Sequence, residues 1–186
     1  MFNWTAGGRR IKLPNVPTAL AAFNGRVFAF DKSNIYTIDP SSFTILDTFE
    51  GIGCAGSEAV MVTEFGMCFA DINNVYLHDG RNPTPVGNSI QTAKENKFGL
   101  DEVNLSTNTK ISFDQKRGSF VIFTQQGQAG LYTEGEELTY MNLPGIPYIG
   151  YYHKDGEDNL FSGAYHTVES LKLMEISATA GDESSV

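Results

Sequence analysis

Residues 51–56 read Gly-Ile-Gly-Cys-Ala-Gly, which is the glycine spacing of loops that bind dinucleotides. Dinucleotide binding also requires a helix directly after the glycines, because the pyrophosphate is held at the helix N-terminus. Residues 57–63 instead read Ser-Glu-Ala-Val-Met-Val-Thr, which alternates and is β-branched in the manner of a strand. We therefore predict a connecting loop that turns sharply at its glycines and holds no cofactor.

The histidines are the next candidates for catalysis or metal binding. His78, His153 and His166 are scattered along the chain, and none has a partner at metal-ligand spacing. His153 and His166 flank an acidic stretch and would meet only if a hairpin brought them together. No nucleophile elbow and no recognised Cys–His spacing accompanies them, so the sequence predicts no catalytic residue, no metal ligand and no enzyme.

The acidic stretch at residues 155–159 reads Asp-Gly-Glu-Asp-Asn and groups four oxygen-bearing side chains. Calcium is bound by such oxygens, but the alternating ligand spacing and the distal glutamate of the known calcium loop are missing. A solvated hairpin turn is the favoured interpretation, and calcium binding stays open as the alternative. The two cysteines, Cys54 and Cys68, are too few for a disulfide framework and are expected to be free thiols.

A cluster of basic residues lies near the N-terminus, in a stretch rich in glycine and proline at residues 1–18. That composition prevents regular structure and predicts an arm or connector. A tryptophan in such an arm has no obvious core to join, so contact with a partner is favoured over a solvated arm. The candidate contact residues are Trp4, Arg9, Arg10 and Lys12.

Composition limits the classes of protein that the chain can belong to. Its 186 residues are 41% hydrophobic and 19% charged, which is typical of a folded domain. The net charge of −9 repels phosphate backbones, so sequence-specific nucleic-acid binding is not expected. No apolar run approaches the ~20 residues of a membrane helix, and residues 1–4 show no basic-then-apolar pattern, so neither a membrane span nor secretion by a signal peptide is expected.

Short β-rich runs separated by turns follow the arm. Residues 19–23 and 26–30 flank Asn24-Gly25, a dipeptide that favours a type I′ hairpin because both residues tolerate positive φ. Residues 35–38 and 43–46 continue the pattern, so a four-stranded antiparallel meander is expected.

The same pattern returns 40 residues later, which is typical of repeat architectures. Two weaker copies are marked by Tyr132, after residues 119–124, and by Leu173, after residues 149–153. The marker residues of the two strong copies are Asp31, Asn34, Tyr36 and Asp39, then Asp71, Asn74, Tyr76 and Asp79.

We therefore predict an all-β fold of antiparallel four-stranded sheets repeated with a period near 40 residues, forming a β-propeller or partial propeller. A β-sandwich is the alternative. The predicted organisation is an arm at 1–18, a β domain at 19–177 with an insertion at 91–110 that includes a short helix from near Ser89, and a flexible tail at 178–186. Aromatic side chains are expected in the core, namely Phe28, Phe30, Tyr36, Phe43, Phe69, Tyr76, Phe113, Phe120, Phe123 and Tyr132.

The region from Pro17 to Ile90 resembles propeller-like structural proteins of tailed bacteriophages. The resemblance is carried by the Gly-rich turn at 51–56, the apolar strands at 60–63 and 66–69, and the Tyr76-Leu77-His78-Asp79-Gly80 hairpin, in that order. The phrase at residues 21–28 looks like the adjoining blade. The chain is shorter than most such nozzle or tail proteins, and its third and fourth units match poorly.

This resemblance implies a non-enzymatic virion structural protein, made in the host cytoplasm and located in the phage tail near the portal. Its implied partners are other virion structural proteins, and it is expected to form a homo-oligomeric ring around the DNA exit path. The alternative is a free-standing propeller module that binds a protein or a glycan. No cofactor is expected under either interpretation.

Overall fold

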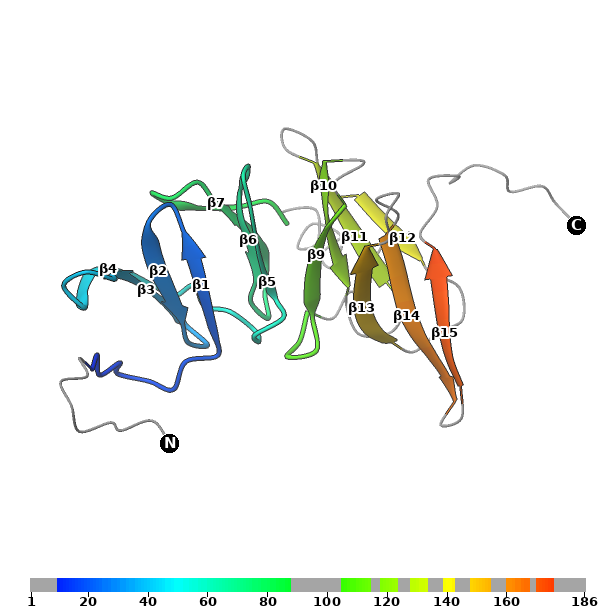
Figure 1. The fold of residues 1–186 in the computed structure, drawn as a ribbon, viewed down its shortest axis with the longest axis horizontal. Coiled ribbons are helices and arrows are strands. Elements are labelled where there is room, and N and C mark those ends of the chain that lie inside the picture. Colours follow the sequence, from blue (N-terminus) through cyan, green and yellow to red (C-terminus); the bar gives the residue numbers. More distant parts are fainter. Residues whose placement is uncertain are drawn as a thin grey trace, which may run out of the picture.

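The computed structural model describes residues 10–87, 105–114 and 118–123, and the backbone of 128–133, 139–142, 148–154, 160–167 and 170–175. Every regular element in these described ranges is a β-strand, and the strands form four antiparallel sheets in sequence order (Figure 1). The predicted all-β class of antiparallel sheets is confirmed. The described part contains no helix of the length and apolarity needed to cross a membrane.

The first sheet is a four-stranded meander of β1 (Ala19–Phe23), β2 (Arg26–Phe30), β3 (Asn34–Asp39) and β4 (Thr44–Glu50). The predicted Asn-Gly hairpin is confirmed, because Phe23 pairs with Arg26 and the two turn residues, Asn24 and Gly25, have φ of 50° and 73°. The prediction was wrong at Phe43, which has φ of 57°, precedes β4 and is 45% exposed. The turn that begins at Asp39 places Phe43 in the left-handed region and so outside the strand and the core.

The second sheet repeats this meander with β5 (Val60–Thr63), β6 (Gly66–Ala70), β7 (Val75–His78) and β8 (Pro83–Pro85). The predicted return of the pattern after 40 residues is confirmed, since residues 26–30 and 66–70 form the equivalent strands β2 and β6. Strand β8 has only three residues and contains two prolines, which suits the edge of a sheet because proline cannot donate a ladder hydrogen bond.

The third sheet has the order β12-β11-β10-β9, with β9 (Lys110–Asp114), β10 (Ser119–Phe123), β11 (Gln128–Thr133) and β12 (Thr139–Asn142). The fourth has three strands, β13 (Tyr148–Lys154), β14 (Leu160–Thr167) and β15 (Ser170–Glu175). Tyr132 pairs with Phe120, near the start of β10, whereas Tyr36 and Tyr76 pair near the ends of β2 and β6. Tyr132 therefore lies in the third strand of its sheet, as Tyr36 and Tyr76 do, which confirms the predicted strand order of this copy, but it is not at the equivalent register position.

The first three sheets are joined by two apolar clusters, each between the faces of neighbouring sheets. The first cluster includes Phe28, Phe30 and Ile35 from the first sheet and Met67, Phe69 and Tyr76 from the second. The second cluster includes Cys68, Ala70 and Val75 from the second sheet and Ile111, Phe120 and Ile122 from the third. Alternate residues of β6 thus enter opposite clusters, so the second sheet is covered on both faces.

Most of the predicted aromatic core is confirmed, because seven of its ten residues are buried. Phe113 is partly buried, and the side chain of Tyr132 lies outside the described residues. The buried members are Phe28, Phe30, Tyr36, Phe69, Tyr76, Phe120 and Phe123.

The first strands of successive sheets are neighbours, because β1 contacts β5 and β5 contacts β9. The first and last sheets lie at opposite ends of the long axis in Figure 1. The predicted helix of the insertion, near Ser89, lies outside the described residues. Leu105, at the C-terminal end of the predicted insertion, is buried in the second cluster, and β9 begins at Lys110.

Candidate functional site

The glycine-rich loop at residues 51–56 connects β4 to β5 and packs against the β2–β3 turn. The Cys54 amide donates a hydrogen bond of 2.9 Å to the carbonyl oxygen of Asp31. A Cβ on Gly53 would overlap the backbone of Asp31 and Lys32, which explains why a residue without a side chain occupies this position. Residues 57 and 58 form a turn and β5 follows at Val60, so the predicted absence of a helix after these glycines is confirmed.

Asp31 directly follows β2 and organises the turn to β3. One carboxylate oxygen, Oδ1, accepts hydrogen bonds from the backbone amides of Ser33 (2.6 Å) and Asn34 (2.7 Å). The other, Oδ2, accepts from the Tyr36 hydroxyl (2.8 Å) and the Asn15 side-chain amide (2.9 Å). The side-chain amide of Asn34 donates to both oxygens, at 3.1 Å to Oδ1 and 2.9 Å to Oδ2. Burial raises the pKa of Asp31, but these hydrogen bonds outweigh it and lower the pKa to about 2.

The second sheet repeats this arrangement at Asp71. Its Oδ1 accepts from the amides of Asn73 and Asn74, both at 2.7 Å, and Oδ2 accepts from the Tyr76 hydroxyl at 3.3 Å. Burial, together with the charge of Asp71, raises the pKa of Tyr76 to about 12. The repeated Asp-x-x-Asn-x-Tyr sequence therefore stabilises the turn between the second and third strands of each of these two sheets.

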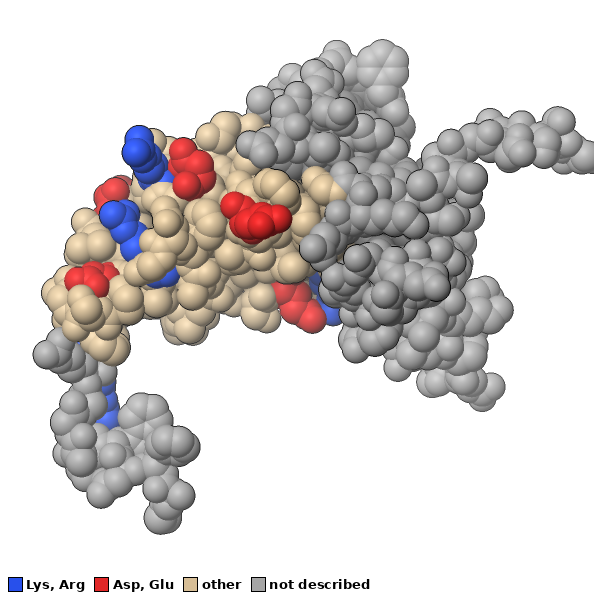
Figure 2. Space-filling model, turned by 45° about the horizontal axis from the view of Figure 1, so that its top comes forward, with Lys and Arg blue, Asp and Glu red and all other residues tan. Residues whose placement is uncertain are grey.

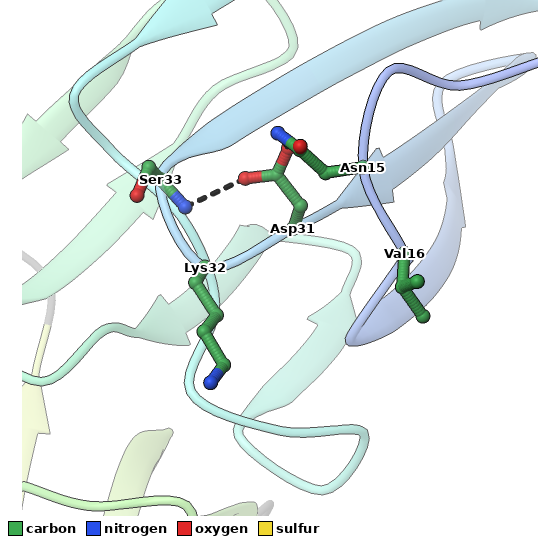
Figure 3. A pocket seen from close by; sticks show the side chains of 5 residues that line it. All are labelled: Asn15, Val16, Asp31, Lys32 and Ser33. Carbon is green, nitrogen blue, oxygen red and sulfur yellow. Dashed lines mark hydrogen bonds between the residues drawn. The ribbon is translucent and has the colours of Figure 1, made fainter.

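A hollow of about 350 Å³ lies beside the first of these turns, lined by Asn15, Val16, Asp31, Lys32 and Ser33 (Figure 3). The close-up shows the Asp31 carboxylate directed at the Ser33 amide and the Asn15 side chain, while Lys32 points away from it. Because Asp31 already accepts hydrogen bonds at both oxygens, it is poorly suited to serve as a general base or a cation ligand here.

His78 lies at the junction of the first two sheets and is fully buried. Its Nδ1 accepts a hydrogen bond of 2.9 Å from the Gly80 amide, and Nε2 is buried without a hydrogen-bond partner. The ring packs edge-on against Phe28 and Phe49, with centroid distances of 4.9 and 5.8 Å. Burial lowers the pKa of His78, opposed by the charge of Asp79, so the neutral ring is favoured and serves as a core side chain.

Both cysteines are free thiols, as predicted, and both are buried. Burial raises the pKa of Cys54 to about 11 and also raises the pKa of Cys68. Neither thiol therefore has the thiolate character that a nucleophile needs near neutral pH.

The N-terminal segment is partly packed rather than free where the structure describes it. Ile11 and Leu13 pack against Ala29, Tyr36 and Ile38 of the first sheet. The alternation of Ile11, Lys12 and Leu13 was the signal for this contact in the sequence, and sequence reasoning missed it together with the role of Asn15.

The predicted arm residues Arg10 and Lys12 are exposed, whereas Trp4 and Arg9 lie outside the described residues. Figure 2 shows Lys and Arg interspersed with Asp and Glu over the described part of the visible face.

The two other histidines are not brought together by the fold. His153 pairs with Phe161 across the β13–β14 hairpin, five residues before His166 along β14. The acidic stretch at 155–159 lies outside the described residues. Among the residues that the structure describes, no group of three or more His, Cys, Asp or Glu could hold a metal ion. No family model matches the chain, and no curated protein matches it significantly.

Proposed function

We propose that the chain is a non-enzymatic structural protein of a tailed-phage particle, built as a partial β-propeller that contributes to a ring near the DNA exit path. The proposal rests on the resemblance of residues 17–90 to phage structural proteins and on the stacking of the sheets. The observation that carries it is the neighbouring position of β1, β5 and β9. In a propeller, the first strands of the blades lie side by side around the central axis in this way.

The polar chemistry of the described part supports an architectural role. The buried carboxylates Asp31 and Asp71 hold turns, buried His78 packs among aromatic rings, and the thiols are buried with raised pKa values. These groups stabilise sheets and turns, as expected for a protein that forms part of the wall of a ring. The net charge of −9 suits a wall along which DNA slides without sticking.

The test is the presence and copy number of the chain in purified particles. Particles banded on a density gradient should contain the chain in several copies, quantified by mass spectrometry against a capsid protein. Antibodies against it should label the tail end by electron microscopy. Absence of the chain from intact particles would overturn the proposal. Capture of a glycan or a single soluble protein would then favour the free-standing binding module.

A further inference from the structure

The two faces of the first sheet have different coverings. We call the face that carries Val27, Ala29, Tyr36 and Ile38 the N-terminal face of the first sheet. A shift of 40 residues places these four residues on Met67, Phe69, Tyr76 and His78 of the second sheet. In the second sheet, this same face is covered by the first sheet.

No described sheet covers the N-terminal face of the first sheet; its centre is covered instead by Ile11 and Leu13. Beside them, Leu20 is 66% exposed and Val16 is 85% exposed. Leu20 pairs with Ala29 in the ladder, as Val60 pairs with Phe69. Val60 packs into the cluster between the first two sheets. Leu20 therefore has the position of a residue that packs between two sheets, but no described sheet lies against it.

Charge is divided unevenly between the two ends of the chain. Residues 1–18 contain three basic residues and no acidic residue, whereas residues 143–186, which include the fourth sheet, contain seven Asp and Glu against two Lys and Arg. Because Ile11 and Leu13 are turned toward the sheet, the exposed Arg10 and Lys12 between and beside them face outward. The N-terminal face therefore carries the exposed Leu20, and the segment that covers its centre carries two exposed cations.

We propose that the N-terminal face of the first sheet docks the C-terminal end of a second copy of this chain, head to tail, and so continues the stacking of sheets across the contact. Leu20 supplies the apolar anchor, and Arg10 and Lys12 meet the acidic end of the neighbour. Such a heterologous contact generates a ring when the rotation closes and a filament when it does not. The inference rests on the proposed function, because it names the partner and the surface of that assembly.

The test is light scattering on the purified full chain across concentration and salt. The wild type should rise from the monomer mass of 20.4 kDa to higher mass as concentration increases. Leu20→Lys should raise the concentration of half-assembly about tenfold. The double variant Arg10→Glu/Lys12→Glu should weaken assembly at low salt, with a difference that shrinks as salt is added.

Matched controls keep exposure and charge constant. Ile72→Lys changes a side chain that is 60% exposed in the β6–β7 turn, and Arg26→Glu/Arg81→Glu makes the same change in net charge on exposed residues elsewhere. Both should assemble as the wild type does. A further experiment tests whether the contact is head to tail. A chain that carries Leu20→Lys, Arg10→Glu and Lys12→Glu has an altered N-terminal face but an unchanged C-terminal end. In mixtures it should therefore bind one end of wild-type assemblies, stop their growth and lower their mean mass.

The outcomes separate this inference from the proposed function. A wild type that stays at 20.4 kDa at every concentration overturns head-to-tail docking, while its presence in particles would still support the structural role. Assembly that Leu20→Lys and its control weaken equally, or mixtures in which no capping occurs, also overturns docking at this face. A chain that assembles as expected but is absent from particles overturns the phage role alone.

Discussion

The N-terminal faces of the first and second sheets have the same position in the repeat but different surroundings. On the second sheet, Phe69 is fully buried and packs against Phe30 of the first sheet at a centroid distance of 5.1 Å. On the first sheet, the equivalent residue is Ala29, buried beneath Ile11 and Leu13. The comparison shows that the repeat fixes which residues face the neighbour, whereas the neighbour decides how large those residues can be.

The largest expected effect comes from breaking the covered face. Phe69→Ala removes a fully buried ring between two sheets and should lower the free energy of unfolding by about 3–5 kcal/mol. Leu20→Ala, at the exposed edge of the equivalent face, should change it by less than about 0.5 kcal/mol in the monomer. Urea unfolding followed by circular dichroism measures both, and equal losses would contradict the contrast.

The two aspartate turns sharpen the comparison. Asp31→Ala should cost about 2–3 kcal/mol, because it leaves several buried donors without an acceptor. Asp71→Ala should cost about 1 kcal/mol less, since Asp71 lacks the side-chain amide bonds that Asp31 accepts from Asn15 and Asn34, and its bond from the tyrosine is 3.3 Å rather than 2.8 Å. Urea midpoints of the two variants decide this; a larger loss at Asp71 would refute it.

Acid should act on the same turn. The pKa of Asp31 is lowered to about 2 in the folded chain, so its stabilising contribution is present above the ordinary value of 3.8 and is lost as the pH falls toward 2. Asp31→Asn should be less stable than the wild type at pH 6, and the gap should narrow toward pH 2. Thermal midpoints of the two proteins across this pH range measure the difference in stability. A difference that stays constant with pH would mean that the shape of the side chain, and not its charge, causes the loss.

His78 gives a smaller, pH-dependent effect at the covered face. Because its pKa is lowered in the folded state, the unfolded chain binds the proton first, and stability falls as the pH drops below 6.5. The loss is at most about 1.4 kcal/mol per pH unit. His78→Gln should remove this part of the slope in unfolding experiments between pH 7.5 and 5.5. Ile38→Val, at the equivalent position of the first sheet, is the control and should leave the slope unchanged.

The smallest expected effect is at the junction of the second and third sheets, where Lys110 and Glu58 form an ion pair of 2.7 Å. Glu58 is 65% exposed, so a double-mutant cycle with Glu58→Gln and Lys110→Gln should give a coupling energy of about 0.5 kcal/mol or less. A coupling above ~1.5 kcal/mol would mean that charge, rather than the apolar cluster, holds this junction.

The sequence predicted the first two sheets well because each strand there ends at a turn with its own chemistry. Asn24-Gly25 and the two aspartate turns fix the register locally, so alternation then sorts residues onto faces. The third sheet lacks the Asp-x-x-Asn-x-Tyr sequence. Matching by tyrosine alone therefore identified the correct strand but not the correct register position along it.

The covering of the first sheet could not be predicted from its composition. Glycine and proline around residues 11–13 mark an irregular segment, but they do not reveal that Ile11 and Leu13 cover the centre of the face. Likewise, the partner of Asn15 depends on where the chain returns, 16 residues later, and this is a tertiary property.

The two buried thiols lie in different junctions. Cys54 belongs to the cluster between the first and second sheets, and Cys68 to the cluster between the second and third. Alkylation of each sulfur must wait until its own junction opens, because burial suppresses the thiolate. The alkylation rate of Cys54 therefore reports how often the junction of the first and second sheets opens, and that of Cys68 reports the same for the second and third sheets. The two opening rates can be measured on the unmodified chain.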